Sequence, residues 1–530
     1  MEVKKKEKMK RKEKKKMKKM RKIVALLLVV LMIGSMTGCK KGTKANSNKN
    51  GGKEVTIAYW NAGEGLEWLT EYVDVFNESQ SEWYVKINAS ASQEGLIAPF
   101  GQADIDETDL YMVGGAFDKQ YLEPLEDMLE ETAEGDKKPL KDKIRKEYLE
   151  LSKNADGHFY QITNKMPANG IVYNKALFEE ARIEVTPRTT DELAIASDKL
   201  VQKGHYAWVH FKGSAYYFMA RDAWRLQYDG ADYYYNKFIK IEDEQGNSPS
   251  LEVLTKKDGR YEALKVMEQI LTPTNVLPGS NSYDHITAQT MFLTGNNIGM
   301  MVNGIWLANE MADVGSTDGF EMMKMPVISS ITDKLETVKS DQVLRQLVSA
   351  IDEVTEGTAE ESKYKSGDGY VVDGKQISAA DWDYVKKARN TIYTTGAGDG
   401  WCIPNYAKEK EGAKEFLKFM FSDKGIKMAR NTSTFAISTG EEQDLSHLGS
   451  YEMSVEKLSQ TAEQYALSTA IGLAHPIFAQ DMTDAYAYQK QYFHYFCAAN
   501  SADRLSADQV WDTIVDEFNA KFDTWVEKTK

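Results

Sequence analysis

The sequence predicts an α/β protein with largely parallel sheets, because short β-rich segments alternate with amphipathic segments along most of the chain. Hydrophobic residues make up 42% of the 530 residues and aromatic residues 11%, which is enough for sizeable cores. The length indicates two or three domain-sized cores. No internal repeat and no long low-complexity segment interrupts the alternation after about residue 53.

The first elements are a strand, a helix and two further strands. Residues 54–60 are rich in β-branched and aromatic side chains, as strands are. Residues 67–78 repeat apolar side chains at helical spacing, and residues 82–90 alternate apolar and polar positions. Residues 108–115 form an apolar run that ends at a glycine pair, which predicts a buried strand.

Capping residues mark the helices that follow. Asn174 stands between a predicted strand and a helix, in the N-cap position. Thr189 and Glu192 have the spacing of a capping box at the start of another helix. Residues 411–425 and 511–525 repeat apolar side chains at i, i+3, i+4 and i+7, which predicts helices that bury one face.

The first 38 residues have the features of an export signal. Residues 1–22 carry 14 Lys or Arg against three Glu, and residues 23–38 are almost wholly apolar. Sixteen apolar residues are too few for a bilayer, which needs about 20. The stretch ends in Met36-Thr37-Gly38-Cys39, which resembles the lipobox of bacterial lipoproteins and implies lipidation of Cys39. Residues 39–53 read as a flexible tether, although an ordinary signal peptide with a chance cysteine is the simpler alternative.

Removal of this segment exposes a very acidic chain. The whole chain has a net charge of −14, and the part after residue 38 keeps 52 basic against 77 acidic residues. Such a surface repels phosphate backbones, so nucleic acid is not expected as a partner. Only Cys402 and Cys497 remain after Cys39, which is too few for a disulfide framework. We expect two buried free thiols, and a single bridge between them is the alternative.

Five segments of the chain, taken in order, resemble the extracellular solute-binding proteins of ABC importers, in the maltose-binding-like group of carbohydrate-binding lipoproteins. Each segment alone is less specific than a catalytic signature, but their order, spacing and coupling to a lipobox carry the resemblance. The segments are residues 55–78, 109–129, 166–193, 292–311 and 398–425.

The resemblance implies a two-lobed periplasmic-binding-protein-like fold of type II, with crossing hinge segments near 165–170, 395–403 and 440–455. Residues between Pro326 and Gly396 exceed what a compact family member has, and they read as a polar loop, a small hairpin and a helix that enlarge the second lobe. The expected domains are a signal peptide (1–38), a lipidated tether (39–53), lobe 1 (54–168, with 400–440 returning to it) and lobe 2 (169–399 with insertion 327–395, and 450–530 returning to it).

The resemblance also points to a ligand site of aromatic and polar side chains. Sugar sites need flat apolar faces for pyranose rings and planar polar groups for hydroxyls. Ligands of α/β sheets collect at the carboxyl ends of strands, which is where Trp60 stands. Trp306, after Asn303-Gly304, takes the place of the family's ring-stacking residue, although Asn303-Gly304 alone would read as a hairpin turn. The expected ligand-binding residues are Trp60, Asn61, Tyr216, Tyr217, Trp306, Asp399 and Trp401.

Signals for catalysis are poor. The sequence has no H-E-x-x-H and no G-x-S-x-G, and its seven histidines lack metal-ligand spacing, so neither a cofactor nor a metal is expected. The expected protein is a monomeric, lipid-anchored receptor outside the bacterial cytoplasm, which binds a sugar or oligosaccharide and delivers it to the permease subunits of an ABC importer. Two alternatives stay open: a secreted lipoprotein enzyme that acts on polysaccharide, and a binding protein for a non-sugar solute.

Overall fold

A computed structural model of the protein describes residues 51–529 except 62, 64, 114–116, 155, 164–165, 213–215, 395–399, 432–447, 468–474, 476 and 478–492. The predicted signal segment (1–38) and Cys39 lie outside the described residues. Within the described part, no helix has the length and apolar character needed to cross a membrane. Residues 53–530 form one unit, which holds the two lobes described below.

Lobe 1 is built on a four-stranded sheet in the order β12-β3-β1-β2. Strands β1 (Lys53–Trp60), β2 (Trp83–Ser90) and β3 (Leu110–Met112) are parallel, and β12 (Trp401–Cys402) joins β3 in the antiparallel direction. The predicted strands at 54–60 and 82–90 are therefore confirmed. In the parallel part, the carboxyl ends of β1, β2 and β3 meet at one edge of the sheet.

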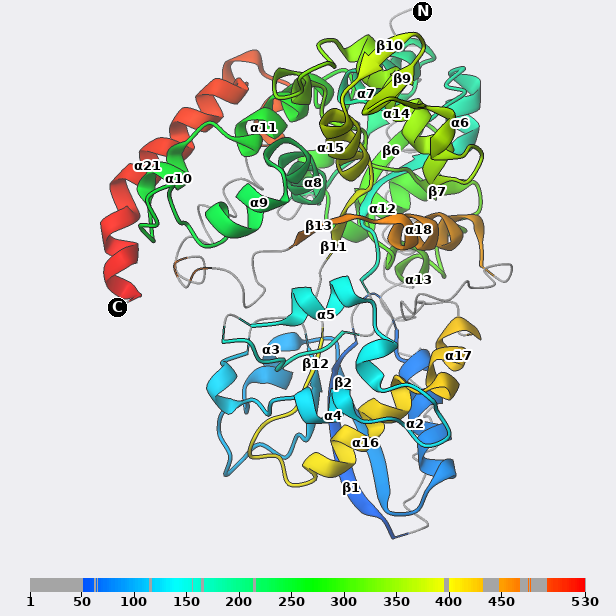
Figure 1. Ribbon diagram of the computed structural model, residues 1–530, viewed down its shortest axis with the longest axis vertical. Coiled ribbons are helices and arrows are strands. Elements are labelled where there is room, and N and C mark those ends of the chain that lie inside the picture. The colour runs from blue at the N-terminus through cyan, green and yellow to red at the C-terminus, as the bar shows by residue number, and fades with distance from the viewer. Residues whose placement is uncertain are drawn as a thin grey trace, which may run out of the picture. The chain divides into compact units, whose positions relative to one another are not determined.

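The helices of lobe 1 cover the sheet with apolar stripes. Helix α2 (Glu67–Ser79) buries Leu69, Tyr72, Val73 and Phe76, the positions that its period predicts. Helix α16 (Lys410–Met420) comes much later in the chain but lies beside α2 (Figure 1), with Phe416 5.3 Å from Phe76 between ring centroids. The remaining helices of this lobe are α3 (Gln93–Ile97), α4 (Glu126–Glu130), α5 (Lys146–Ser152) and α17 (Asp423–Asn431).

Lobe 2 is built on a second four-stranded sheet, in the order β5-β6-β4-β7. Its strands are β4 (Gly170–Asn174), β5 (Tyr206–Trp208), β6 (Ile298–Asn303) and β7 (Phe320–Met322). A pair of parallel strands, β11 (Thr391–Thr394) and β13 (Gln464–Leu467), lies beside helix α8 (Tyr217–Asp229).

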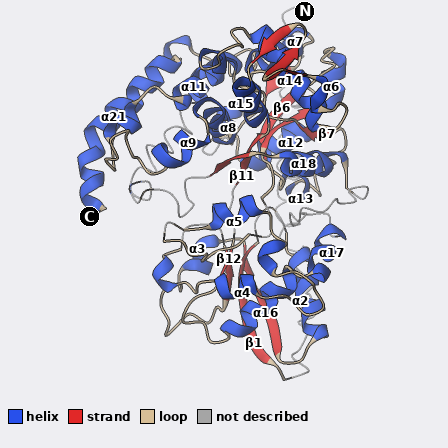
Figure 2. Ribbon diagram, in the orientation of Figure 1, coloured by secondary structure: helices blue, strands red, loops and turns tan. Residues whose placement is uncertain are grey.

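Helices make up most of lobe 2 (Figure 2). Asn174 caps α6 by accepting a hydrogen bond from the backbone N–H of Leu177, as predicted. The C-terminal helix α21 buries Trp511, Ile514, Phe518 and Trp525 on its predicted stripe. Besides α8, the helices that the structure describes in lobe 2 are α6 (Lys175–Glu180), α7 (Thr190–Gln202), α9 (Ala231–Tyr233), α10 (Leu251–Thr255), α11 (Gly259–Ile270), α12 (His285–Thr294), α13 (Leu307–Glu310), α14 (Asp341–Thr355), α15 (Ala379–Arg389), α18 (Ser450–Thr461), α20 (Phe493–Phe496) and α21 (Ala507–Lys528).

The insertion 327–395 packs into the hydrophobic core of lobe 2. It contains helices α14 and α15 and an antiparallel sheet of three short strands, β8 (Lys365–Ser366), β9 (Gly369–Val372) and β10 (Lys375–Ile377). The indole of Trp382 stacks on Tyr370 with ring centroids 4.0 Å apart and the planes 8° from parallel. The hairpin and the helix are therefore present, together with a third strand and a packed interior that the polar sequence did not predict.

Two local predictions need correction. The sheets are mixed rather than largely parallel, because β12 and β4 run antiparallel to their neighbours. Both of these strands come directly after segments that connect the lobes, so they enter their sheets from the opposite end. The capping box of α7 is only half formed: Thr189 caps the helix, but the Glu192 carboxylate accepts from the backbone and guanidinium of Arg188.

Two of the segments that connect the lobes run side by side. Ile162 pairs with Trp401 on the lobe 1 side, and Asn169 pairs with Tyr393 on the lobe 2 side, both in antiparallel bridges. The first half of the third predicted crossing, residues 440–447, lies outside the described part, and residues 450–455 belong to helix α18. Crossing segments paired in this way let each lobe keep its own sheet.

The two thiols expected to be free, Cys402 and Cys497, are indeed free and buried.

Candidate ligand-binding site

Trp60 and Asn61 lie at the carboxyl end of β1. The backbone N–H of Asn61 donates to the carbonyl of Ser90, 2.9 Å away, and the Trp60 indole Nε1–H donates to the carbonyl of Ala91 at 3.2 Å. The indole of Trp60 is partly buried and packs against a small cluster that includes Tyr111. Lobe 1 therefore presents a partly exposed aromatic side chain at the edge of the sheet where ligands of α/β proteins collect.

Trp306 is placed by the turn that follows β6. The Asn303 side chain accepts a hydrogen bond from the N–H of Gly304 at 2.8 Å, and the carbonyl of Gly304 accepts one from the hydroxyl of Tyr451 at 2.6 Å. A Cβ on Gly304 would lie 2.3 Å from the Trp306 ring and 2.4 Å from Oδ1 of Asn169. The turn leads into α13 rather than into a hairpin, and its glycine leaves the space that the indole occupies.

Tyr216 packs against Trp306. Their ring centroids are 5.3 Å apart at an interplanar angle of 67°, an edge-to-face arrangement. Tyr216 has φ 51° and ψ −9°, a left-handed conformation that costs a residue other than glycine on the order of 1–3 kcal/mol. Burial, with a contribution from the negative Glu310, raises the pKa of the Tyr216 hydroxyl well above its usual value. Strained residues of this kind concentrate at binding sites, where surrounding contacts hold them.

Glu310 was missed by the sequence reasoning. Its backbone N–H donates to the carbonyl of Trp306 at 2.9 Å, so the two residues are neighbours on one face of the α13 segment. The Glu310 carboxylate accepts a hydrogen bond from Nε2 of Gln289, a fully buried residue of α12, at 2.9 Å. Burial raises the pKa of this carboxyl group. The i, i+4 spacing from Trp306 was the signal that could have identified it.

The loop after β1 lies against this group. A Cβ on Gly63 would be 2.5 Å from Cβ of Trp306 and 2.7 Å from Oε1 of Glu310. Nδ2 of Asn309 donates to the carbonyl of Gly63 at 2.8 Å. The segment that begins with Trp60 and Asn61 therefore leads directly to Trp306, which brings three of the predicted site residues into one region.

Two buried amide oxygens beside this region have no hydrogen-bond partner among the described residues. They are Oδ1 of Asn169 and Oε1 of Gln289, and their side chains are 2% and 0% exposed. Buried polar atoms are nearly always hydrogen-bonded, by protein, water or ligand. Oδ1 of Asn169 can only accept a hydrogen bond, and a water molecule, hydroxyl or N–H group that reached it would satisfy it.

Three predicted site residues lie elsewhere in the structure or outside its described part. Tyr217 is fully buried, and its ring centroid lies 5.9 Å from that of Trp208. Successive residues of a helix point about 100° apart, so Tyr217 faces the core and Tyr216 does not. Trp401 is also fully buried, and its ring meets Trp68 at 6.4 Å in the core of lobe 1. Both side chains have core positions, which leave no face for a ligand. Asp399 lies outside the described residues.

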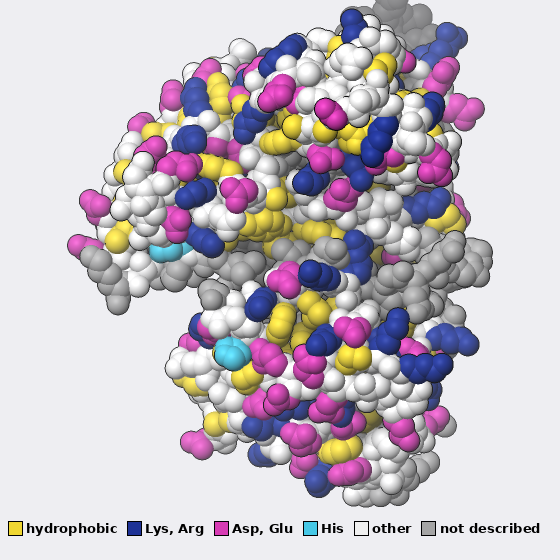
Figure 3. All heavy atoms as spheres, in the orientation of Figure 1, with side chains coloured by type: hydrophobic (Ala, Val, Ile, Leu, Met, Phe, Trp, Pro, Cys, Tyr) yellow, Lys and Arg dark blue, Asp and Glu magenta, His cyan; other side chains and the backbone are white. Residues whose placement is uncertain are grey.

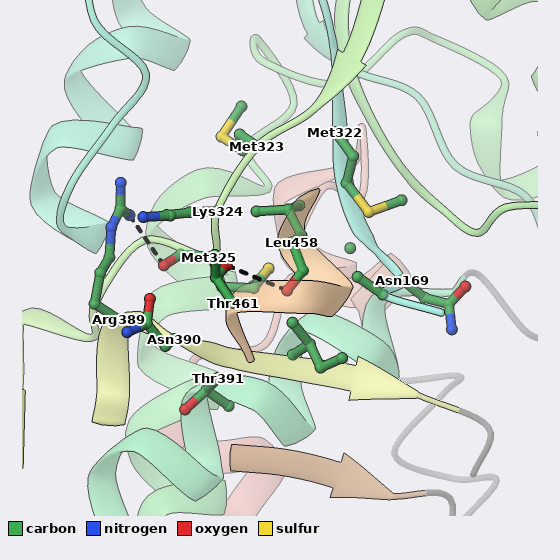
Figure 4. Close-up of a pocket in the computed structure, with 13 residues that line it drawn as sticks. Asn169, Met322, Met323, Lys324, Met325, Arg389, Asn390, Thr391, Leu458 and Thr461 are labelled. Carbon is green, nitrogen blue, oxygen red and sulfur yellow. Dashed lines mark hydrogen bonds between the residues drawn. The ribbon is translucent and has the colours of Figure 1, made fainter. Parts of the chain in front are cut away.

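The crossing segments enclose a small cavity (Figure 4). It is lined by Asn169 from the first crossing segment, Thr391 from the second, and Leu458 of α18, and its volume of about 10 Å³ suits about one water molecule. The Asn169 amide points away from the side chains of Arg389 and Thr391 (Figure 4). This cavity is therefore a packing feature of the crossing segments and is too small for a solute.

A larger cavity of about 540 Å³ lies on lobe 2 between the starts of α7 and α14 and one face of α11. Carboxylates, hydroxyls and one ammonium group dominate its lining, including Asp191, Glu262, Lys265 and Ser330, and no aromatic side chain takes part. Acidic and basic side chains are also mixed over the face of the molecule in Figure 3. The aromatic region around Trp306 therefore remains the better candidate for ligand binding.

The comparisons with known proteins identify the family of the chain. A model of the family described as bacterial extracellular solute-binding protein matches residues 67–427, more than half of the chain. The diacetylchitobiose binding protein NgcE of Streptomyces coelicolor is 26% identical over 176 residues, which cover 33% of this chain and 35% of that protein. The match thus spans about a third of this relative's length.

Solved structures show the same fold at low sequence identity. The bacterial solute receptor AcbH, described as having an exclusive preference for β-D-galactopyranose, gives a TM-score of 0.58 at 14% identity, with 89% of this chain and 100% of that chain covered. A chitin oligosaccharide binding protein gives a TM-score of 0.53 at 16% identity, with 88% of this chain and 98% of that chain covered. These neighbours support the two-lobed solute-receptor architecture.

Proposed function

Because this chain belongs to the family of bacterial extracellular solute-binding proteins, we propose that it captures a sugar or oligosaccharide outside the cytoplasm and delivers it to the permease of an ABC importer. Relatives described as binding diacetylchitobiose, β-D-galactopyranose and chitin oligosaccharides support the ligand class. The proposed role is non-catalytic, and the expected partners are the ligand and the permease subunits.

The observation that carries the proposal is the group formed by Trp306, Tyr216 and Asn169. The indole and the phenol supply rigid apolar area for the C–H faces of a pyranose ring. The free amide oxygen of Asn169 can accept a hydrogen bond from a hydroxyl beside that ring. Trp60 and Asn61 supply a second aromatic and polar pair from lobe 1.

Closure of the lobes is the proposed delivery signal. A ligand that contacts both lobes stabilises the state in which both sets of contacts exist, because only differential affinity shifts an equilibrium. The crossing segments, which pair at Ile162 with Trp401 and at Asn169 with Tyr393, are suitable hinges because the chain passes from one lobe to the other there.

A lipid on Cys39 would keep the receptor near its importer. One acyl chain holds a protein weakly, whereas more than one gives stable anchoring, with each buried CH₂ contributing about 0.8 kcal/mol. Export by the segment 1–38, lipidation of Cys39 and a monomeric receptor are part of the proposal. Cys39→Ala should move the protein from the detergent phase to the soluble fraction, and unchanged partitioning would refute the anchor.

The test of the ligand class is a titration with defined glycans. Galactose, maltotriose and N,N′-diacetylchitobiose should be screened by thermal shift and then by calorimetry. Trp306→Ala should weaken binding of whichever glycan binds by about 1–3 kcal/mol, the scale of a lost aromatic contact, with little change in melting temperature. Trp83→Ala, at a partly buried indole outside the site, is the control and should leave affinity unchanged.

Other outcomes would redirect the proposal. New reducing ends after incubation with polysaccharide would favour an enzyme. Binding of a non-sugar solute alone, with no response to any glycan, would keep the receptor role and overturn the ligand class.

A further inference from the structure

The carboxylate of Glu310 stands near the aromatic rings of Trp306 and Tyr216, and it forms no ion pair within the part of the chain that the structure describes. A Cβ built on Gly63 would lie 2.7 Å from Oε1 of Glu310 and 2.5 Å from Cβ of Trp306, so these two atoms lie close to each other. Tyr216, which packs edge-to-face on Trp306, is close enough for the charge of Glu310 to act on its hydroxyl.

Within the described residues, the Glu310 carboxylate has one hydrogen bond, from the neutral amide of Gln289 at 2.9 Å, and no ion pair. A basic side chain, the imidazole of His285 on α12, acts on Glu310 at longer range and opposes the rise in the Glu310 pKa that burial causes. Two other carboxylates with little exposure are paired with cations: Glu123 meets Lys410 and Lys414, and Asp352 meets Arg389 and Lys324. A partly desolvated carboxylate is costly unless a cation or several donors approach it.

We propose that Glu310 is a specificity-determining residue that makes this site prefer glycans with a protonated amino group. The inference rests on the proposed sugar-binding function and adds the class of sugar, an amino sugar that is not acetylated. The ammonium group would lie between the Glu310 carboxylate and the aromatic rings of Trp306 and Tyr216, while the pyranose ring would pack on the indole.

Two physical effects favour this ligand. An ammonium near a carboxylate in a partly desolvated site forms a charge-assisted hydrogen bond that is stronger than one from a neutral hydroxyl. An ammonium over an aromatic face gains a cation–π attraction, which is largest for tryptophan. The chain's net charge of −14 also attracts cationic rather than anionic glycans at low ionic strength.

The experiment compares three trisaccharides on the full mature chain. The probes are the glucosamine trimer, its fully N-acetylated counterpart and maltotriose, titrated at pH 6, where the free amines are protonated. The variant Glu310→Gln keeps the side-chain shape and can still accept from Gln289. The matched control, Glu244→Gln, removes one exposed carboxylate from a loop of the same lobe.

The wild-type protein should bind the glucosamine trimer at least tenfold more tightly than the other two, and Glu310→Gln should abolish this preference while its affinity for maltotriose changes less than twofold. The preference should also weaken as the ionic strength rises from about 0.05 to about 0.5 M, because salt screens the ion pair. Melting curves of both variants verify folding.

Equal or better binding of the acetylated or neutral trimer by the wild type would overturn the inference and leave the sugar receptor intact. An amine preference that survives Glu310→Gln would also overturn the role of Glu310. Failure of every glycan to bind would overturn both the inference and the proposed function.

Discussion

Adding one methyl group at Gly304 should disturb the ligand site without removing any of its groups. A Cβ at this position would lie 2.3 Å from two atoms of the Trp306 ring and 2.4 Å from Oδ1 of Asn169. The backbone of Gly304 is outside the left-handed region, so the alanine of Gly304→Ala is strained only by lack of space. The substitution therefore acts on the position of the Trp306 ring.

The size of the effect follows from the overlap. Non-bonded carbon atoms settle at roughly 3.5–4.0 Å, so the indole must move away by more than about 1 Å. Overpacking of this kind costs about 1–3 kcal/mol in stability. If the displaced ring no longer stacks on the ligand, binding becomes weaker by a similar free energy. This corresponds to a Kd that is about 5- to 150-fold higher.

Isothermal titration calorimetry and thermal denaturation measure the two quantities. Gly315→Ala is the matched control on the same lobe, because its Cβ would meet no atom closer than 3.7 Å, which is ordinary van der Waals contact. The control should keep both affinity and melting temperature. Wild-type affinity and stability in Gly304→Ala would refute the placement of Trp306, since the ring would then have room that the structure does not give it.

Two further predictions concern motion and pH. A glycan that binds at saturation should reduce the radius of gyration in solution scattering and raise the melting temperature with concentration; unchanged dimensions would argue against a closing receptor. The buried carboxylate of Asp381 accepts hydrogen bonds from the backbone N–H groups of Glu336 and Thr337 at 2.9 and 2.6 Å. Burial alone would raise the pKa of Asp381, but these bonds and one from the Thr337 hydroxyl hold it below its usual value. Asp381→Asn should therefore lower the unfolding free energy by about 1–3 kcal/mol at neutral pH. This difference should shrink as the pH falls from the usual pKa of an aspartate through the lowered folded-state pKa, because protonation removes the same contribution from the wild type. Denaturant titrations of both proteins at several pH values measure it, and a constant difference at all pH values would contradict the assignment.

Local sequence patterns predicted the helices and strands well. The apolar stripe of α2, the N-cap at Asn174 and the buried stripe of α21 each depend on residues a few positions apart. Local sequence is therefore enough to predict them. The directions of β4 and β12 were not predictable in this way. They depend on the end from which each strand enters its sheet after the chain crosses between lobes, a property of the path and not of the strand.

The candidate site shows the same difference between what local sequence predicts and what the fold decides. Aromatic side chains and a glycine in a recognisable order were enough to select Trp60, Tyr216 and Trp306 as candidates. Only the tertiary structure separated Tyr216 from Tyr217 and placed Trp401 in a core, because neighbouring residues on a helix or strand point to different faces and the packing partners come from distant segments. Glu310 and Asn169 join the site for the same reason: the sequence supplies their chemistry, and the fold brings it to the Trp306 ring.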